Sequence, residues 1–266
     1  MSVRRLFRGW VSWEAIESIA RELADRYDQD VVRVEFFDVD NWLSTPCVVN
    51  ETWFVKIVTR QNALVHALFT GARNLGAFSS GSEGFFERFE SPLAMAEHEV
   101  ESTRRMREIG LNAPRPIESF ESSGRGVIVL EYLENSVRLD ELSGDEIEVL
   151  TPDLFSALAT MHVNELAHGD LRAENVLVQD GVIYFIDVTA VSTRRLPAVR
   201  SYDVASALAA LTPHVGAAMA VDGARQYYDE DVLVDAVDFL DFVNIRPDHD
   251  FDAPAVKGEV AKIAGT

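Results

Sequence analysis

The stretch from His168 to Val188, HGDLRAENVLVQDGVIYFIDV, places three polar side chains around two short apolar runs: Asp170, Asn175 and Asp187. An amide oxygen and a carboxylate together suit a hard cation such as Mg²⁺, which takes one or two protein oxygens and keeps water and phosphate as its other ligands. A further acid close by could orient an attacking hydroxyl group. These residue types therefore indicate phosphate chemistry, provided that the fold brings them together.

The local sequence predicts that Asp170, Asn175 and Asp187 lie close together. Asp180-Gly181 separates the runs NVLV and VIYFI, and this dipeptide is typical of the two-residue turn of a β-hairpin. Asn175 precedes the first predicted strand and Asp187 follows the second, so a hairpin would place them side by side. Asp170 lies five residues before Asn175, in a loop too short to carry it far away. The alternative is that these are solvated side chains on a very acidic surface; the strongly apolar run before Asp187 favours a single site.

A second candidate is Lys56 in WFVKIV, a predicted strand that is otherwise apolar on both faces. It is the only lysine before residue 257. A chain that uses arginine elsewhere and keeps lysine here indicates a need for a compact ammonium charge. The alternative is a strand lysine that extends into solvent. Glu99 on a predicted helix could orient the ammonium group, and spacing leaves Glu97 and Glu101 as competitors.

The elements that must position these residues follow from periodicity and caps. Strands are predicted in VVRVEFF, TPCVV, TWFVKIV and GVIVLEYLE. Helices are predicted in SWEAIESIARELADRYD and in the segment that Ser91 and Pro92 open and Gly110 ends. Further helices are predicted over 62–69, 148–163, 200–210 and 224–244, and GARNLGAFSSGSEG is predicted to be a loop.

This order of elements predicts an α+β fold of two lobes, a small β-rich N-lobe and a mainly helical C-lobe. The expected domains are an N-terminal helical extension over 1–30, the N-lobe over 31–134 and the C-lobe over 135–266. Within the N-lobe, residues 60–89 form an insert. The insert is either a surface for a substrate or partner, or a segment that only packs on the lobes.

Composition bounds the functional classes. Hydrophobic residues make up 47% of the chain, and 44 Asp and Glu residues against 24 Lys and Arg residues give a formal charge of −20. Such a charge argues against a nucleic-acid surface and favours solubility by self-repulsion. The sequence has no apolar run long enough to predict a membrane span, and its N-terminal residues lack the apolar core of a signal peptide. Cys47 is the only cysteine, so no intrachain disulfide can form, which favours an intracellular, cytoplasmic protein. Its apolar neighbours predict that Cys47 is a core residue.

The excess of acidic residues, with only three lysines, indicates a salt-loving cytoplasm. Salt screens charge repulsion beyond about 8–10 Å at moderate ionic strength. We therefore expect the melting temperature of the ligand-free protein to rise from dilute buffer to molar KCl, measured by differential scanning calorimetry. A flat or falling curve would contradict the halophilic interpretation and leave the site predictions untouched.

HGDLRAENVLV followed by IDV resembles the catalytic and metal loops of the protein-kinase-like superfamily, whose pattern is His-x-Asp-Leu-x-x-x-x-Asn and then an Asp after a short hairpin. WFVKIV resembles the strand of its phosphate-binding lysine. GLNAPRPI, VIVLEYLE, and HGDL in place of His-Arg-Asp resemble the RIO family of atypical kinases most closely, and DGVIYFIDVTAV resembles its RIO1 branch. The resemblance covers about residues 31–211.

The resemblance implies a kinase that uses ATP and Mg²⁺. In this interpretation Asp170 is the catalytic acid–base residue, and Asn175 and Asp187 hold Mg²⁺ and complete the catalytic set. Lys56 contacts the ATP phosphates and pairs with Glu99.

The resemblance also assigns adenine to backbone groups of the segment from Glu131 to Leu133. His168 is expected to support the catalytic loop, and His162 to pack in the preceding helix. For Asp203 two interpretations stay open, a buried brace of the catalytic loop or the N-cap of a helix.

The sequence departs from the family pattern at two points. DVDNWLS, between the first two strands, has no glycine, whereas a Gly-rich loop would supply backbone N–H groups to phosphate. Asp187 is followed by Val188 and Thr189 instead of Phe-Gly, and no Ala-Pro-Glu segment follows, so a regulated activation loop is not expected.

These features favour a RIO-like serine/threonine kinase or ATPase that acts on a protein or small-molecule phosphoacceptor. Two alternatives stay open. One is a small-molecule phosphotransferase of the aminoglycoside- or sugar-kinase type. The other is a pseudokinase scaffold that binds nucleotide.

Overall fold

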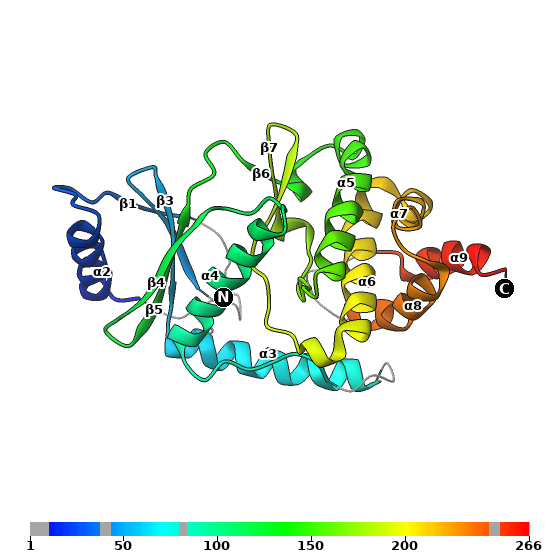
Figure 1. The fold of residues 1–266 in the computed structure, drawn as a ribbon, viewed down its shortest axis with the longest axis horizontal. Helices are drawn as coiled ribbons and strands as arrows, with labels where there is room; N and C mark the ends of the chain where they lie inside the picture. Colours follow the sequence, from blue (N-terminus) through cyan, green and yellow to red (C-terminus); the bar gives the residue numbers. More distant parts are fainter. Residues whose placement is uncertain (1–10, 38–43, 80–83, 245–250, 266) are drawn as a thin grey trace, which may run out of the picture. The chain divides into compact units, whose positions relative to one another are not determined.

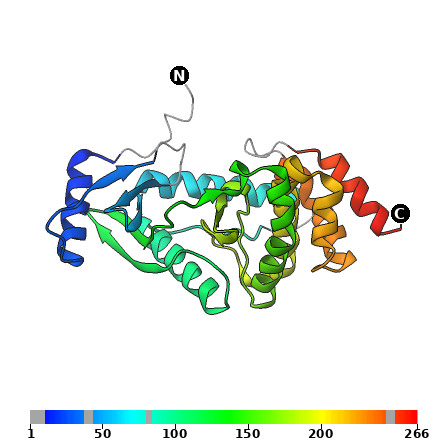
Figure 2. The same ribbon diagram turned by 90° about the horizontal axis from the view of Figure 1, so that it is seen from above.

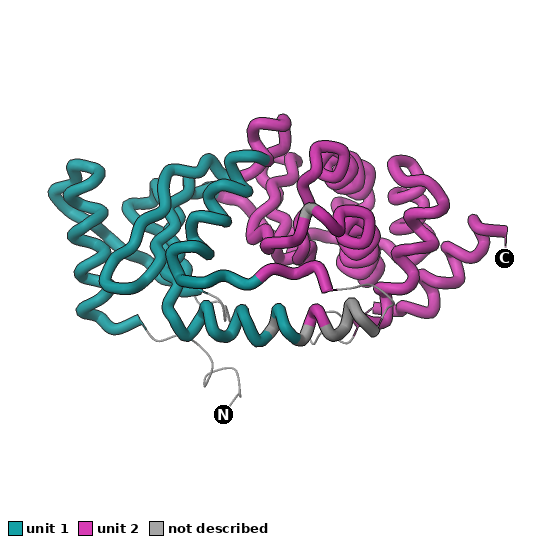
Figure 3. The backbone as a smooth tube through the Cα atoms, turned by 60° about the horizontal axis from the view of Figure 1, so that its bottom comes forward, with its two compact units in different colours: residues 1–71, 88–105, 114–134 teal, residues 72–87, 106–113, 135–266 magenta. Residues whose placement is uncertain are grey.

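The computed structural model describes residues 11–37, 44–79, 84–244 and 251–265. They divide into two compact units that interleave along the chain (Figure 3). The first unit comprises residues 1–71, 88–105 and 114–134, and the second comprises residues 72–87, 106–113 and 135–266. Within the described ranges, no helix has both the length and the apolar composition that a membrane span requires.

The first unit is built on a five-stranded antiparallel sheet of order β1-β2-β3-β5-β4. Its strands are β1 (Val34–Phe36), β2 (Thr45–Val49), β3 (Trp53–Val58), β4 (Pro116–Ser122) and β5 (Arg125–Glu131). Helices α2 (Trp13–Arg26) and α4 (Pro92–Glu108) lie on its two faces (Figures 1 and 2). Because side chains alternate along a strand, Val127 and Val129 of β5 pack with Ile19 of α2, and Ile128 and Leu130 pack on the α4 face.

The predicted ends of α4 are confirmed. The Ser91 side chain accepts the Ala94 N–H at 3.0 Å, Pro92 opens the helix, and Gly110 follows its end with a φ of 85°. Strand β4 was not predicted from the sequence. Pro116 starts this strand, and only part of the polar run PIESFES is buried, so the strand lacks a clear apolar alternation.

The predicted loop GARNLGAFSSGSEG is wrong over its first half, because helix α3 (Arg60–Ser79) continues through it. Gly71 and Gly76 lower the helix propensity of this segment, but contacts distant in sequence compensate for it. They involve Arg73 and Asn74 and are described below. Residues 80–83 of the predicted loop lie outside the described residues.

The second unit is mainly helical. Its helices are α5 (Gly144–Val163), α6 (Leu196–Val215), α7 (Ala217–Ala224), α8 (Glu230–Asn244) and α9 (Ala253–Ile263). A three-stranded antiparallel sheet of order β6-β7-β8 accompanies them, made of β6 (Val137–Arg138), β7 (Val176–Gln179) and β8 (Val182–Phe185). Short 3₁₀ turns occur at Leu139–Glu141, Ala173–Asn175 and Thr193–Arg195. Helix α6 is the centre of the core, with an unbroken buried run from Ser201 to Thr212.

Three helix predictions for this unit need correction. Helix α6 begins at Leu196 and continues through Pro213 to Val215, so it is longer than the predicted 200–210. Helix α5 begins at Gly144, where Ser143 and Glu146 form a capping box, and not at Glu148. The helix predicted over 224–244 begins later than expected, since α8 starts at Glu230, and Ala224 instead ends α7, which was not predicted. Helix α9 was not predicted.

Candidate functional site: a braced acidic loop and a buried lysine pair

The predicted hairpin is present and joins the two ends of the candidate site. Strands β7 and β8 pair from Val176 with Phe185 to Gln179 with Val182. Asp180 and Gly181 form the turn with φ values of 52° and 76°, as the turn type favoured in two-residue hairpins requires. The hairpin therefore brings the residues that flank its strands to one end.

Asn175 connects both sides of that end. It is 3% exposed, and its side-chain Nδ2 donates to the Asp170 carbonyl oxygen at 2.8 Å. Its own carbonyl oxygen accepts the N–H of Ile186, the residue before Asp187, at 3.1 Å. Asp170, Asn175 and Asp187 thus belong to one hydrogen-bonded loop system in the second unit, and they are not separate surface residues.

Asp187 has a left-handed backbone conformation with a φ of 62°. Non-glycine residues adopt it rarely, although Asp and Asn tolerate it better than most, and such residues cluster at functional sites. The segment that follows is fixed from both directions. Thr189 donates its N–H to the His168 carbonyl at 2.9 Å, and Ser192 donates to the Phe85 carbonyl at 2.8 Å. Helix α6 begins soon after, at Leu196, so the segment between Asp187 and this helix is short.

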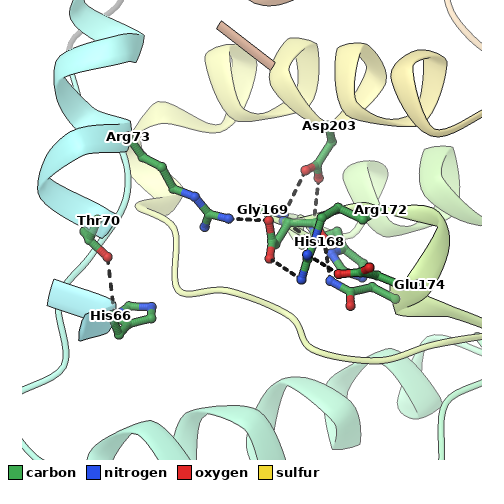
Figure 4. Close-up of polar contacts among 10 residues, drawn as sticks. His66, Thr70, Arg73, His168, Gly169, Arg172, Glu174 and Asp203 are labelled. Carbon is green, nitrogen blue, oxygen red and sulfur yellow. Dashed lines mark hydrogen bonds and ion pairs between the residues drawn. The ribbon is translucent and has the colours of Figure 1, made fainter. Parts of the chain in front are cut away.

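Asp203 braces the loop that carries Asp170. Its carboxylate is fully buried within α6; Oδ2 accepts the His168 N–H at 2.7 Å, and Oδ1 accepts the Gly169 N–H at 2.8 Å. Because α6 begins at Leu196, Asp203 is not an N-cap. The structure therefore decides between the two interpretations that the sequence left open. Figure 4 shows Asp203 reaching from its helix to this loop.

A second buried layer holds Asp203 from behind. His162, near the end of α5, places Nε2 at 3.1 Å from Asp203 Oδ2. The hydroxyl of Tyr228 lies 2.9 Å from His162 Nδ1. Burial raises the pKa of Tyr228 above its ordinary value, so this hydroxyl keeps its proton. His162 therefore links α5, and through Tyr228 the segment between α7 and α8, to the brace, a role beyond the packing that the sequence indicated.

His168 and Gly169 shape the backbone in front of Asp170. Complete burial lowers the pKa of His168 and outweighs the opposing effect of the carboxylates of Asp203 and Asp170, so the ring is neutral. Its Nδ1 accepts the Asp170 N–H at 3.3 Å, which requires an unprotonated nitrogen. Gly169 has a φ of 73°, and a Cβ atom there would lie 2.8 Å from Val191 Cγ1. Only glycine fits this turn.

Two arginines contact the Asp170 carboxylate, and neither was predicted from the sequence. Arg73, from the C-terminal part of α3, forms an ion pair with Oδ1. Arg172 Nη2 lies 3.5 Å from Oδ2 and is also paired with Glu174 (Figure 4). Arg172 lies two residues from Asp170 and could have been considered from the sequence. Arg73 is 97 residues away, in a segment predicted to be a loop, and gave no local signal.

In the first unit, Lys56 forms a buried ion pair. Its Nζ lies 2.7 Å from Glu99 Oε1, and the two side chains are 5% and 12% exposed. Lys56 therefore does not extend into solvent. It shares the α4 face of β3 with Val58, while Glu99 lies on the side of α4 that buries Ala96 and Val100. Glu97 and Glu101 are exposed, which settles the choice of partner.

The predicted adenine segment, residues 131–133, begins with the last residue of β5 and continues beyond the strand. The Glu131 N–H donates to the Arg115 carbonyl at 2.9 Å, and the Tyr132 N–H donates to the Thr52 carbonyl at 3.0 Å. Leu133 is 8% exposed. Adenine binding at Glu131 and Leu133 remains a prediction. Of the glycine-free segment DVDNWLS, only Ser44 is among the described residues.

Oxygen ligands for a hard cation are present in the second unit. The Asn175 amide uses Nδ2 toward Asp170, so Oδ1 is the atom suited to a cation, and Asp187 supplies a carboxylate. No cluster of three or more His, Cys, Asp or Glu side chains that could hold a metal occurs in the described part of the chain. Mg²⁺ needs no such cluster, because one or two protein oxygens are sufficient. The pair therefore fits Mg²⁺ better than Zn²⁺.

Comparison with known proteins gives consistent similarities. Residues 86–202 match the family model of the RIO domain. KEOPS complex subunit Bud32 of Pyrococcus abyssi (strain GE5 / Orsay) is 29% identical over 92 residues, which are 34% of this chain and 41% of Bud32. This chain thus spans about two fifths of the length of that relative.

Among solved structures, an aminoglycoside-3'-phosphotransferase of type VIII matches with a TM-score of 0.53 and 15% identity, over 87% of this chain and 100% of the other. The PAN3 pseudokinase of Drosophila melanogaster matches with a TM-score of 0.41 and 12% identity, over 82% and 59%. The first of these similarities confirms the predicted α+β fold class and extends over most of the chain.

Proposed function

We propose that this chain, which matches the RIO-domain family model over residues 86–202, is a protein-kinase-like protein that binds Mg-ATP and transfers or hydrolyses the terminal phosphate. The finer proposal is a RIO-like atypical kinase that acts on a serine or threonine hydroxyl of a protein, or an ATPase built on the same site. ATP and Mg²⁺ are the proposed cofactors.

One observation carries the proposal. The Asn175 side chain bonds to the carbonyl of Asp170, while its backbone bonds to the residue before Asp187. One buried residue, itself a proposed metal ligand, thus bonds both to the backbone of the proposed base and to the backbone next to the other proposed ligand, Asp187. Random surface acids would not share such bonds, and residues 86–202, which match the RIO-domain family model, include this whole loop system.

Asp170 is the proposed base. Asp203 accepts the N–H groups of the two residues before Asp170, and the His168 ring accepts the N–H of Asp170 itself. The backbone position from which the Asp170 carboxylate extends is therefore fixed. A carboxylate in such a place can accept the proton of an acceptor hydroxyl, or orient a water molecule in an ATPase.

Lys56 is proposed to contact the ATP phosphates, and Glu99 to hold its ammonium group in position. The 2.7 Å bond between them and their burial support this proposal, since a buried lysine needs an acidic partner. Mg²⁺, held by Asn175 and Asp187, would neutralise charge on the transferred phosphate.

Mg-ATP is expected to stabilise the wild-type protein, because a ligand at about a hundred times its dissociation constant adds about 2.7 kcal/mol. Thermal shift with Mg-ATP, compared with ATP plus EDTA, measures this. Lys56→Met should lose most of the Mg-ATP shift, because methionine fills a similar volume without the charge. Lys257→Met is the matched control, since Lys257 also pairs with an acid, Asp241, at 2.7 Å, but on the surface.

Other results would change the proposal. No shift in either condition would contradict nucleotide binding, and equal shifts would indicate a metal-independent pseudokinase. A shift that Lys56→Met retains would remove Lys56 from the site. Labelled ATP, incubated with the protein in high salt, then separates transfer to proteins, transfer to small molecules and release of free phosphate.

A further inference from the structure

The inserted segment contributes a side chain to the catalytic loop. Arg73 lies on the part of α3 that belongs to the second unit, and its guanidinium group forms an ion pair with Asp170 Oδ1. Both side chains are largely buried, at 15% and 7% exposure. A contact of this kind is less screened than a surface ion pair, and the planar fork of arginine gives it a defined direction.

Arg73 is held in place by its neighbour. The Asn74 side chain donates from Nδ2 to the Phe86 carbonyl and accepts the Phe86 N–H through Oδ1, both at 2.9 Å. These two hydrogen bonds tie α3 to the end of the insert. A Cβ atom at Gly84 would lie 2.7 Å from Asn74 Cβ, so the close approach requires glycine. The Arg73 guanidinium also lies 5.1 Å from the centre of the Phe86 ring.

The end of the insert is in turn fixed to the core. Phe85 and Phe86 are 1% and 5% exposed, and their rings lie 5.6 and 5.3 Å from the ring of Tyr202 in α6. Phe86 forms a β-bridge with Val191, and the Glu87 N–H donates to the Ala190 carbonyl at 3.0 Å. The insert therefore pairs directly with the segment that follows Asp187.

The second arginine makes a weaker contact. Arg172 lies at 3.5 Å from the other carboxylate oxygen and shares its charge with Glu174. Arg73 is thus the closer cation. A carboxylate offers about four acceptor positions, so an arginine on one oxygen leaves room for a hydroxyl donor.

We propose that Arg73 is a positioning residue that holds the Asp170 carboxylate in the orientation needed to accept the proton of the phosphoacceptor. The inference rests on the proposed function. It assigns the insert a part in the site, beyond a packing segment or a partner surface. A small displacement of a catalytic base lowers the rate of the chemical step strongly. Loss of Arg73 should therefore lower turnover and leave the affinity for nucleotide unchanged.

The test compares Arg73→Ala and Arg73→Lys with the wild-type protein and with Arg60→Ala, a matched control at an exposed position at the start of the same helix. Arg73→Ala should lower kcat by about tenfold or more while the Kd for Mg-ATP stays unchanged. Arg73→Lys keeps the charge without the fork and should be intermediate. Guanidinium chloride at millimolar concentration should restore part of the Arg73→Ala turnover, and Arg60→Ala should behave like wild type.

The double variant Arg73→Ala with Asp170→Asn should be no slower than Asp170→Asn alone, because Arg73 acts through Asp170. Unchanged turnover in Arg73→Ala would overturn the inference while leaving the proposed function in place. A rise in turnover would also overturn it, because the contact would then be inhibitory. A wild-type protein that neither transfers nor releases phosphate would refute the proposed function and this role with it.

Discussion

Asp187→Asn is expected to weaken Mg-dependent nucleotide binding and to abolish turnover, whereas Asp170→Asn should leave Mg-ATP binding nearly intact and reduce turnover at least about a hundredfold. The two residues differ in their place in the loop system. Asp187 follows the hairpin whose other end is Asn175, and Asp170 lies outside the hairpin. Isothermal titration with Mg-ATP and a phosphate-release assay separate the two effects.

The hairpin offers a matched control in Asp180→Asn. Asp180 is exposed and has a φ of 52°, close to the 62° of Asp187, and asparagine tolerates that conformation well. The control should therefore bind and turn over like wild type. Loss of binding in Asp170→Asn with retained binding in Asp187→Asn would reverse the roles assigned here. Unchanged turnover in both variants would mean that this loop is not the catalytic site.

Asp203→Ala should both destabilise the second unit and reduce turnover strongly, although Asp203 is not proposed to touch a substrate. The substitution leaves the buried N–H groups of His168 and Gly169 without their charged acceptor. Two such losses cost on the order of 3 kcal/mol or more. Chemical denaturation measures the free energy of unfolding, and phosphate release measures the rate at a temperature where the variant is folded.

Asp235→Ala, on the exposed side of α8, is the control for this experiment and should stay within about 0.5 kcal/mol of wild type. A folded Asp203→Ala variant with wild-type turnover would show that the brace stabilises the fold without shaping the site. Wild-type stability in Asp203→Ala would contradict the energetic role of the buried carboxylate itself.

Local sequence was sufficient where the structure depends on near neighbours. The Asp180-Gly181 turn and its flanking apolar runs predicted the hairpin, and Ser91, Pro92 and Gly110 predicted both ends of α4. These signals are strong because the residues that make the contacts lie within a few positions of each other. The same locality explains why the Asn175–Asp187 end of the hairpin could be anticipated.

For the partner of Lys56 and the role of Asp203, the sequence left a few alternatives, and the packing of the helices decided between them. Spacing left Glu97, Glu99 and Glu101 open as partners of Lys56, the family resemblance implied Glu99, and the orientation of α4 on its sheet places Glu99 in the ion pair. The two interpretations of Asp203 were separated in the same way, by the start of α6 at Leu196. A helical period does not give the absolute rotation of a helix against its neighbour when its charged residues are spread around it.

The sequence by itself determined the hairpin, the capped helix and the residue types of a phosphate-handling loop, because each depends on short-range turns, caps and side-chain chemistry. Only the tertiary structure decided that α3 continues past Gly71, that Arg73 meets Asp170 and that Asp203 braces the loop. Asp203 and Arg73 make contacts with partners 34 and 97 residues away. Contacts over such separations depend on how whole elements pack, and that packing overrides the local glycine and serine signals of the insert.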